Sequence, residues 1–482
     1  MHFLSVLHVA GSLVLVLGFS QLIPLGVTLH YSENDWVVFL YSSLGATLLG
    51  AGLMLVSRTS KEISDRDGFF VVTLGWIAAA GVGAIPFYFT GSVDSLTDAV
   101  FESMSGFTTT GASIFTEYQD KGHGLILWRS MTQWFGGMGI IVLALVILPA
   151  LGIGGMQLYK REVPGPTSEK LTPRLRDTAR ALWSVYLGIT VLETVVLLIL
   201  GMSFFDAVNH ALTTVATGGF STRAGSIAEF NSPGIEWALI VFMLMAGMNF
   251  SLHYRLLVQR KLRLPHIQDL EWRWYLGAVT IVSAAVIATL VLTRGYDLSE
   301  AVTKGTFQVV SVLTTTGFGS DDYVVWGAFP QILMVFLMIT GGCAGSTSGG
   351  VKWVRILLVF QYIYMEMLRL VHPRVVIHAK INNTRITPDI LSNIFAFLFL
   401  FLTTLAATTL LISLDGHSIL TSVGAAASAL GNVGPGLDAV GPLGNYHHLS
   451  DYAKWVLILA MLMGRLELMT VFVLFMPQVW KR

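Results

Sequence analysis

Four short strips rich in threonine and glycine interrupt the apolar stretches of this chain and constrain its fold more than any other feature. Each strip lies between two long apolar segments, and the strips occupy residues 108–113, 217–221, 314–319 and 431–436. A dehydrated cation can be held by a ring of backbone carbonyls, which needs one such strip from each of four equivalent positions. Glycine lets a carbonyl turn inward because its backbone adopts φ/ψ values that other residues avoid. The four strips therefore predict a repeat architecture around one axis.

Composition places the chain in a membrane. It has 482 residues, of which 54% are hydrophobic and 12% charged, whereas a soluble domain has about 25% charged residues. Lys+Arg and Asp+Glu balance at 29 each, so the net charge gives no indication of a nucleic-acid partner. The single cysteine, Cys343, excludes an intrachain disulfide. We expect an all-α polytopic membrane protein that is surrounded by lipid and binds no nucleic acid.

Apolar runs near or above 18 residues recur along the chain and predict membrane spans. The N-terminus has no Lys or Arg before its first apolar run, so it is predicted to be a span and not a signal peptide. The eighth span is too long for one crossing and contains a glycine-rich interruption. The predicted spans are residues 3–29, 36–57, 68–89, 124–150, 181–204, 234–259, 273–293, 328–371, 388–413 and 452–478.

Charged residues alternate between the two sides of these spans. Basic residues cluster after every even-numbered span, at 58–66, 160–180, 260–263, 369–385 and 481–482. The opposite side is acidic, at 33–35, 94–120, 297–322 and 415–451. Since cytoplasmic loops carry the excess of Lys and Arg, both termini are expected to face the cytoplasm, and all four strips enter from the outside.

A segment too short to span the bilayer precedes each strip. These segments are Ser95–Phe107, Phe205–Ala216, Leu298–Leu313 and Ser418–Leu430, and each begins near an Asp or Ser, as helices do. At ~1.5 Å per residue they reach about half way across the bilayer. Re-entrant helices are tolerated where protein buries them or where they line water. Their C-terminal ends would point at the strips, where the negative end of the helix dipole favours a cation.

The resulting unit is a span, a half-helix, a strip and a second span. Four such pore repeats are predicted around one pore, at residues 68–150, 181–259, 273–371 (with the broken second span) and 388–478. The first two align without a gap, because Asp98 precedes Gly111 by the same interval as Asp206 precedes Gly219. Residues 1–60 form a transmembrane hairpin outside the repeats.

The chain resembles the Trk/Ktr/HKT superfamily of K⁺ transporters over its whole length, and within it the bacterial TrkH subunits, which have an extra N-terminal hairpin. The segments that carry the resemblance are 105–111, 217–222, 314–319 and 341–350. The family's key glycine in each filter strand falls on Gly111, Gly219, Gly317 and Gly434. The fourth strip departs most from the family pattern, since Asn432 and Val433 stand where the other strips have Thr or Gly.

The resemblance implies K⁺ uptake across the bacterial inner membrane by a homodimer with one pore per subunit. It also implies gating by a cytoplasmic ring of RCK-type, TrkA-like nucleotide-binding subunits. This chain contains no nucleotide-binding motif, so we expect it to carry no cofactor of its own and K⁺ to be the transported ion.

Packing of small residues between membrane helices is the alternative explanation for any single strip. Four strips, each after a half-helix on the acidic face, favour a selectivity filter instead. We expect K⁺ to be held by carbonyls of the glycines and of the residues just before them. The predicted filter residues are Thr109, Thr110, Gly111, Gly218, Gly219, Thr316, Gly317, Val433 and Gly434.

The interruption in the eighth span is predicted to be a gate loop beneath the filter. Glycines at four-residue intervals could also serve close helix packing, but hydroxyl residues among five glycines favour a broken, mobile segment. Non-helical backbone at this depth should border the water path. The gate-loop residues are Gly341, Gly342, Gly345, Ser346, Thr347, Ser348, Gly349 and Gly350.

Arg465 lies near the middle of the last span, where an isolated cation costs at least ~2.5 kcal/mol. The alternatives are a salt bridge within the bundle and a place in the cavity below the filter. Glu467 is on the wrong helix face to be the partner. We therefore predict that Arg465 forms an electrostatic barrier to K⁺ in the pore.

Two other function classes remain as rivals. A proton- or Na⁺-coupled symporter would need a buried acid as a relay, and the candidates are Glu193 and Glu366, neither of which adjoins a strip in sequence. An intramembrane enzyme is disfavoured, because Ser346–Ser348 lacks the Gly-x-Ser-x-Gly pattern and no His-Glu-x-x-His motif is present.

Overall fold

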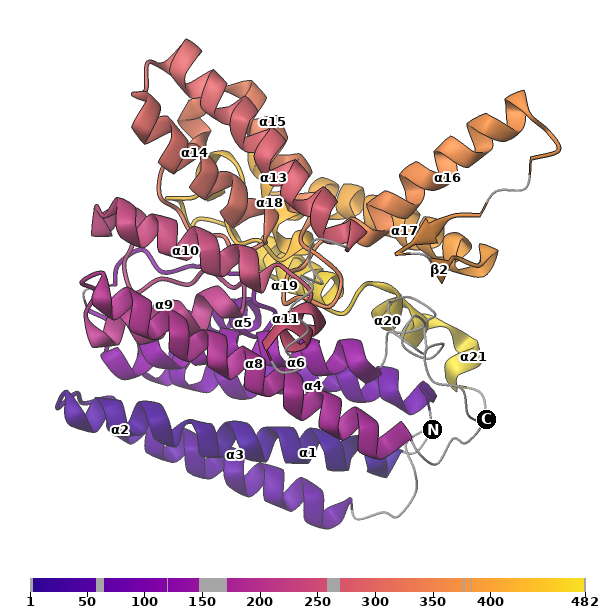
Figure 1. The fold of residues 1–482 in the computed structure, drawn as a ribbon. Coiled ribbons are helices and arrows are strands. Elements are labelled where there is room, and N and C mark those ends of the chain that lie inside the picture. Colours follow the sequence, from indigo (N-terminus) through magenta and orange to yellow (C-terminus); the bar gives the residue numbers. More distant parts are fainter. Residues whose placement is uncertain are drawn as a thin grey trace.

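The computed structural model describes residues 3–57, 65–118, 120–146, 171–257, 269–375, 378–382 and 384–480, and these residues are mostly helical (Figure 1). Among them, six helices are long and apolar enough to cross a membrane, or eight if each of two bent helix pairs counts as one span. The helix α6 and the pair α15 and α16 occupy the other two predicted span positions. The predicted all-α polytopic membrane architecture is confirmed.

The N-terminal hairpin consists of α1 (Phe3–Ser20), α2 (Leu22–His30) and α3 (Trp36–Val56). It lies along one side of the molecule, where α1 packs against α3 and α4 and α2 packs against α6 (Figure 1). Gly11 allows α1 and α3 to approach closely, because a Cβ there would lie 2.8 Å from Leu53 Cβ.

Each pore repeat has a first span, a short pore helix and a second span. The first repeat has α4 (Asp65–Phe89), α5 (Leu96–Phe107) and α6 (His123–Val146), and the second has α8 (Leu171–Ile199), α9 (Phe204–Val215), α10 (Pro233–Ala246) and α11 (Phe250–Leu257). The third has α13 (Leu270–Thr289), α14 (Leu298–Leu313), α15 (Ala328–Thr340) and α16 (Trp353–Val371). The fourth has α17 (Pro388–Ser413), α18 (Ile419–Gly431), α19 (Asp451–Arg465), α20 (Met469–Phe472) and α21 (Pro477–Trp480).

Short elements complete the chain between these helices. They are the strands β1 (Lys380–Ile381) and β2 (Thr384–Arg385), which pair antiparallel, and the one-turn segments η2 (Ser226–Phe230), η3 (Leu290–Arg294), η4 (Tyr323–Trp326), η5 (Asp438–Val440) and η6 (Val473–Phe475).

The four repeats close into a ring through their pore helices. Each pore helix packs against both spans of its own repeat and against the second span of the preceding repeat. The contacts between repeats are α6 with α9, α10 with α14, α15 with α18, and α19 with α5. Because the last repeat packs on the first, the pore helices surround one central axis.

Serine caps begin three of the pore helices. Ser95 Oγ accepts a hydrogen bond from Asp98 N (3.1 Å), and Ser203 and Ser418 cap α9 and α18 in the same way. Each cap satisfies a backbone N–H that has no partner within the helix. The pore helices begin and end within about two residues of the predicted half-helices.

Two second spans that we expected to be continuous, 234–259 and 452–478, are bent, so that part of the prediction was wrong. The helix axis turns by 98° between α10 and α11 and by 106° after Arg465. At the first bend, Gly247 O accepts a hydrogen bond from Cys343 N, and Phe250 N donates one to Gly345 O. The loop of the third repeat thus provides hydrogen-bond partners for backbone groups that the bend leaves unpaired within the helix. At the second bend, Glu467 and Leu468 have positive φ angles, 57° and 45°.

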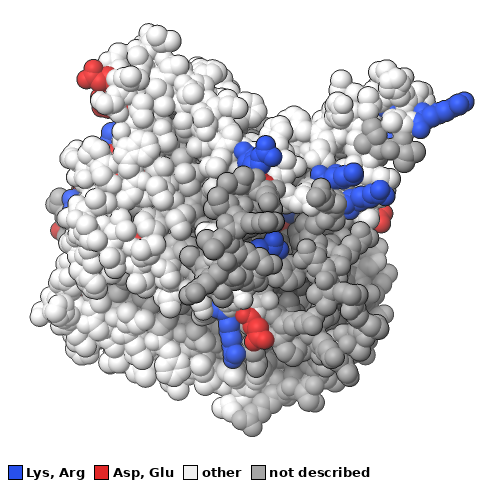
Figure 2. All heavy atoms as spheres, in the orientation of Figure 1, with Lys and Arg blue, Asp and Glu red and all other residues white. Residues whose placement is uncertain are grey.

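On the face shown in Figure 2, the described residues expose few charged side chains, as a lipid-facing surface requires. On the face shown, several Lys and Arg side chains extend around α16 and α17, one acidic group lies at the outer end of α14, and another lies low in the centre beside a basic side chain. The start of α1 and the helix α21 lie on the same side of the molecule (Figure 1). Of the predicted basic clusters, 260–263, 481–482, most of 58–66 and the first half of 160–180 lie outside the described residues.

Candidate cation filter and gate

The four strips share one backbone conformation. In every strip the key glycine has a left-handed backbone, with φ of 81° at Gly111, 76° at Gly219, 84° at Gly317 and 101° at Gly434. The residue two positions earlier is left-handed as well, with φ of 51° at Thr109, 53° at Thr217, 57° at Thr315 and 54° at Asn432. Asn tolerates this conformation better than the β-branched Thr. The unusual fourth strip therefore keeps the geometry of the other three.

Equivalent hydrogen bonds attach each strip to its pore helix. The residue before the glycine donates its N–H to the carbonyl five residues earlier, in the last turns of the helix. These bonds are Thr110 N to Ser105 O (2.8 Å), Gly218 N to Thr213 O (2.8 Å), Thr316 N to Ser311 O (2.9 Å) and Val433 N to Ser428 O (2.9 Å). The C-terminal end of each pore helix, which carries the negative end of the dipole, thus leads directly into its strip.

The strips meet around the axis at the level of the glycines. A side chain on any of these glycines would clash with a backbone oxygen of the next strip. That oxygen belongs to the residue just before the key glycine of the next strip. A Cβ on Gly111 would meet Gly218 O, on Gly219 Thr316 O, on Gly317 Val433 O, and on Gly434 Thr110 O. This sequence of contacts runs from strip one to strip four and returns to strip one. Four backbone oxygens at equivalent positions therefore form a closed ring.

The candidate cation ligands at this site are backbone carbonyl oxygens. The side chains of Thr109, Thr110, Thr316 and Val433 are buried. Neighbouring hydroxyls form hydrogen bonds with each other, as Thr108 Oγ1 does with Thr110 Oγ1 (2.8 Å). In the described part of the chain no three His, Cys, Asp or Glu side chains gather where they could hold a metal ion. A ring of carbonyl dipoles suits a monovalent cation that exchanges its hydration shell for these oxygens.

Two side-chain contacts distinguish the quadrants. Gln133 Nε2 donates to Gly218 O (2.6 Å), and Gln133 Oε1 accepts from Phe220 N (3.1 Å), so α6 supports the second strip. In the fourth strip, Gly434 O accepts from both Ser428 Oγ (2.6 Å) and Tyr446 Oη (2.7 Å). A carbonyl has two lone pairs, so both lone pairs of Gly434 O are engaged, whereas Gly218 O keeps one.

A buried ion pair joins the first strip to the second. Glu102 in α5 and Arg129 in α6 lie 2.5 Å apart and are 0% and 2% exposed. Glu102 Oε2 also accepts from Ile114 N (3.0 Å), and Arg129 donates to Ser221 O (3.1 Å). This pair was not predicted from the sequence. Arg129 could have been found in the way that Arg465 was, because both are charged residues inside a predicted span.

The predicted gate-loop residues, 341–350, lie between α15 and α16 directly against the third strip. Ser348 Oγ donates to Thr314 O (2.7 Å), and Gly349 N donates to Thr315 Oγ1 (2.8 Å). Thr347 Oγ1 lies 3.1 Å from Val215 O in the second repeat. The loop is therefore held at the ends of two pore helices, on the side where the strips begin.

Arg465 is buried next to this loop. Its guanidinium donates hydrogen bonds to two backbone carbonyls, Thr347 O (2.6 Å) and Gly136 O (3.2 Å). Glu467 instead pairs with Lys352 (3.2 Å) and Arg355, just after the loop. The expectation that Glu467 is not the partner of Arg465 is confirmed. The two residues together connect the fourth repeat to the gate loop and to the start of α16.

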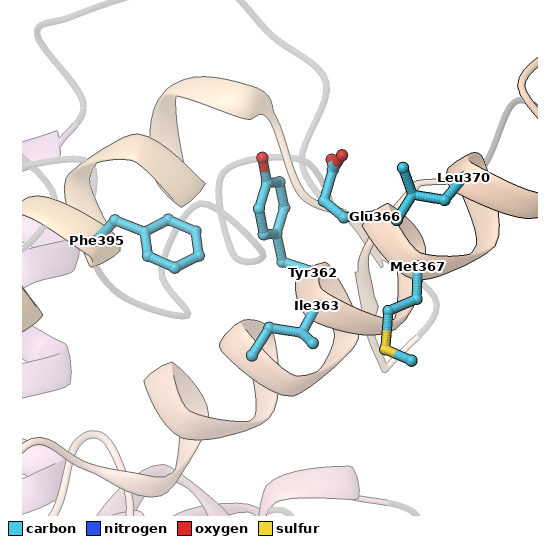
Figure 3. A pocket seen from close by; sticks show the side chains of 6 residues that line it. All are labelled: Tyr362, Ile363, Glu366, Met367, Leu370 and Phe395. Atoms are coloured by element: carbon cyan, nitrogen blue, oxygen red, sulfur yellow. The ribbon is translucent and has the colours of Figure 1, made fainter.

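The two acids considered as proton relays lie in different environments. Glu193 is fully buried in α8 and faces Thr214, shortly before the second strip. It is thus nearer to the filter than the sequence indicated. Glu366 is exposed on α16, where it pairs with Arg369 and lines an open apolar groove (Figure 3). Tyr362, Ile363, Met367 and Leu370 of α16 and Phe395 of α17 form the rest of that groove.

Comparison with known proteins gives matches over most or all of the chain. The family model TrkH, described as a cation transport protein, matches residues 38–482. The Trk system potassium uptake protein TrkH of Escherichia coli K12 is 40% identical over the full length of both chains. Its counterpart in Halomonas elongata is 38% identical over 99% of both. The crystal structure of the potassium transporter TrkH from Vibrio parahaemolyticus matches with a TM-score of 0.92 and 34% identity, and each chain is fully covered.

Proposed function

The chain belongs to the TrkH family of cation transport proteins, which are not enzymes, and we propose that it takes up K⁺ through the ring of strip carbonyls. The closed ring of contacts between glycines and carbonyls is the observation that carries this proposal. The ring oxygens are those of Thr110, Gly218, Thr316 and Val433. Relatives with the same architecture bear the name of potassium uptake proteins.

The glycine carbonyls of the strips form a second, less regular layer in this proposal. Gly111 O lies close to Gly434, whereas Gly434 O is engaged by two hydroxyls. The fourth quadrant thus coordinates K⁺ through Val433 rather than through Gly434. A ring with one complete layer discriminates K⁺ from Na⁺ through the positions of its four oxygens.

We further propose that K⁺ flux is channel-like and is controlled by the gate loop. The loop contacts the third strip, and Arg465 places a positive charge beside the loop, where it acts as a barrier to K⁺. The coupled symporter remains the second candidate function, with the buried Glu193 as the acid that would relay a proton. Glu366 is a poor relay, because it pairs with Arg369 at the surface.

The remaining assignments rest on the family and on the surface. We propose that the protein lies in the bacterial inner membrane with both termini cytoplasmic, and that it consists of the hairpin 1–60 and the repeats 68–150, 181–259, 273–371 and 388–478. A homodimer is proposed from the resemblance to the family, and α16 exposes apolar side chains, among them Tyr364 and Leu370. A TrkA-like nucleotide-binding subunit is the proposed regulator, because the relatives are named as parts of a Trk system.

Uptake of radioactive Rb⁺ into proteoliposomes tests the proposed function. The purified protein is reconstituted with a K⁺ gradient alone, and K⁺, Na⁺ and Li⁺ are added as competitors. We expect uptake without any proton or Na⁺ gradient, blocked strongly by K⁺ and weakly by Na⁺. Uptake that requires a proton gradient would instead support the symporter, and its loss in Glu193→Gln would identify the relay.

A further inference from the structure

One carboxylate bonds both the gate loop and the helix that follows it. Glu271 is the second residue of α13 and is 7% exposed. Its Oε1 accepts a hydrogen bond from Ala344 N (2.7 Å), inside the loop. The same oxygen accepts from Val354 N (3.0 Å) in the first turn of α16, where the chain leaves the loop. Two backbone groups that lie ten residues apart along the chain, one inside the loop and one just after it, are thus joined at one atom.

The start of α13 is itself fastened. Asp269 caps the helix by accepting from Trp272 N (3.0 Å), and Asn382 accepts from Leu270 N (2.8 Å) and donates to Asp269 Oδ2 (2.8 Å). Glu271 therefore projects from a fixed point. The nearby cation Lys352 pairs with Glu467 (3.2 Å), so the backbone N–H groups are the contacts through which Glu271 holds the loop.

We infer that Glu271 is a positioning residue of the gate, whose carboxylate keeps the loop closed against the third strip. This inference rests on the proposed role of residues 341–350 as the gate. A carboxylate forms stronger hydrogen bonds to N–H groups than a neutral acceptor does. Because Val354 belongs to α16, a displacement of this helix away from α13 breaks one of the two bonds and loosens the loop at its base.

Two substitutions test the inference by Rb⁺ uptake into proteoliposomes without any regulatory subunit. Glu271→Ala removes both bonds, whereas Glu271→Gln keeps an acceptor oxygen but not the charge. We expect roughly tenfold higher basal uptake in the Ala variant and an intermediate rate in the Gln variant. The competition by K⁺ over Na⁺ should stay unchanged, since the filter is untouched. Unchanged or reduced uptake by correctly folded Glu271→Ala protein would overturn the assignment.

The single cysteine of the chain provides a second readout that is independent of flux. Cys343 lies in the loop next to Ala344 and is 2% exposed. We expect a small maleimide to modify Cys343 faster in Glu271→Ala than in Glu271→Gln. Both variants lack the charge beside the thiol, so a difference between them reports the position of the loop and not the reactivity of the sulfur. Equal rates would contradict a positioning role.

Gly349→Ala separates this inference from the proposed function. A Cβ on Gly349 would clash with Gly431 O, so this variant displaces the loop without involving Glu271. If Gly349→Ala raises uptake and Glu271→Ala does not, the result supports residues 341–350 as the gate and refutes the positioning role of Glu271. If the wild-type protein shows no K⁺-selective uptake in any form, the proposed function itself fails.

Discussion

The proposed filter and the proposed gate loop adjoin each other but are built differently. The filter is made four times, with nearly the same φ at Thr109, Thr217, Thr315 and Asn432. Among the described residues, the ten-residue interruption occurs in the third repeat, whereas α6 in the first repeat is unbroken as far as Val146 and the second spans of the other two repeats bend after Ala246 and Arg465. A ring of equal backbone units gives a cation equal distances to all its ligands. A single unequal segment can move without disturbing that ring.

The bonds that hold the two regions differ as well. Each strip is attached to its own pore helix by backbone hydrogen bonds, such as Thr316 N to Ser311 O. The loop is held by side chains and carbonyls from other segments, among them Arg465 of the fourth repeat and Gly247 of the second. Changes to the strip backbone should therefore alter selectivity, whereas changes to single side chains around the loop should alter the rate.

The largest effect is expected from Gly317→Ala. A Cβ at this position would clash with Val433 O in the neighbouring strip, and the backbone has a φ of 84°. We expect K⁺-selective Rb⁺ uptake to be lost, because the added methyl group occupies the place of a ring oxygen.

Gly416→Ala is the matched control for that variant. Gly416 has nearly the same φ, 81°, but nothing lies near the position of its Cβ. It thus carries only the backbone strain, which costs about 1–2 kcal/mol. Near-normal uptake is expected in the control, and equal losses in the two variants would show that strain, and not the ring, is responsible.

Arg465→Ala is expected to raise the uptake rate by about tenfold. The substitution removes a charged hydrogen bond to Thr347 O, worth about 1.5–3 kcal/mol, and a positive charge beside the gate. Arg465→Lys keeps the charge but offers a different donor geometry, so we expect an intermediate rate. Initial rates of Rb⁺ uptake measure both variants. Reduced flux in a normally folded Ala variant would count against the barrier, and a wild-type rate in the Lys variant would assign the effect to charge alone.

A few-fold loss of K⁺ over Na⁺ selectivity is expected for Gln133→Leu. The variant removes one donor from Gly218 O, which belongs to the ring, at a cost of about 1 kcal/mol. Gln308→Leu is the comparison, since Gln308 Nε2 bonds Asp321 O (2.6 Å), outside the ring. The ratio of half-inhibitory Na⁺ and K⁺ concentrations in the uptake assay measures the effect. An equal loss of K⁺ over Na⁺ selectivity in both variants would contradict a specific role of the hydrogen bond from Gln133 to the ring oxygen of Gly218.

Asp438→Asn should give the smallest effect, on stability alone. Hydrogen bonds from Ser418 and Thr421 lower the pKa of the Asp438 carboxyl below its ordinary 3.8. Because the folded-state pKa is the lower one, the stabilisation is present above 3.8 and is lost as the pH falls through the folded-state value. The variant should unfold at a slightly lower temperature at neutral pH and at the wild-type temperature in strong acid. A difference that persists in acid would refute the assignment.

The sequence predicted the strips and the pore helices well, because their features are local. Gly111 and its three counterparts mark positions where the backbone must be left-handed, and serine caps mark the starts of three pore helices. The fourth strip was the exception. Asn432 differs from Thr in chemistry, and only the φ of 54° shows that it fills the same conformational role.

Long-range partners account for what the sequence did not predict. The bend at Gly247 depends on bonds to Cys343 and Gly345, about a hundred residues later in the chain. Glu271 is the second residue of a span and looks like an ordinary interfacial acid until the loop is placed beside it. Gln133 is polar within a predicted span, but its partner Gly218 belongs to another repeat. Periodicity and composition contain no information on such pairs.

The central claim is that four strip carbonyls coordinate the transported ion. A crystal structure of the protein soaked in Tl⁺ or Rb⁺, recorded at a wavelength that shows the anomalous signal of the ion, tests it most directly. The account predicts a peak on the axis, equidistant from the oxygens of Thr110, Gly218, Thr316 and Val433. A peak elsewhere in the protein, such as beside Glu193, with none at the ring would contradict it.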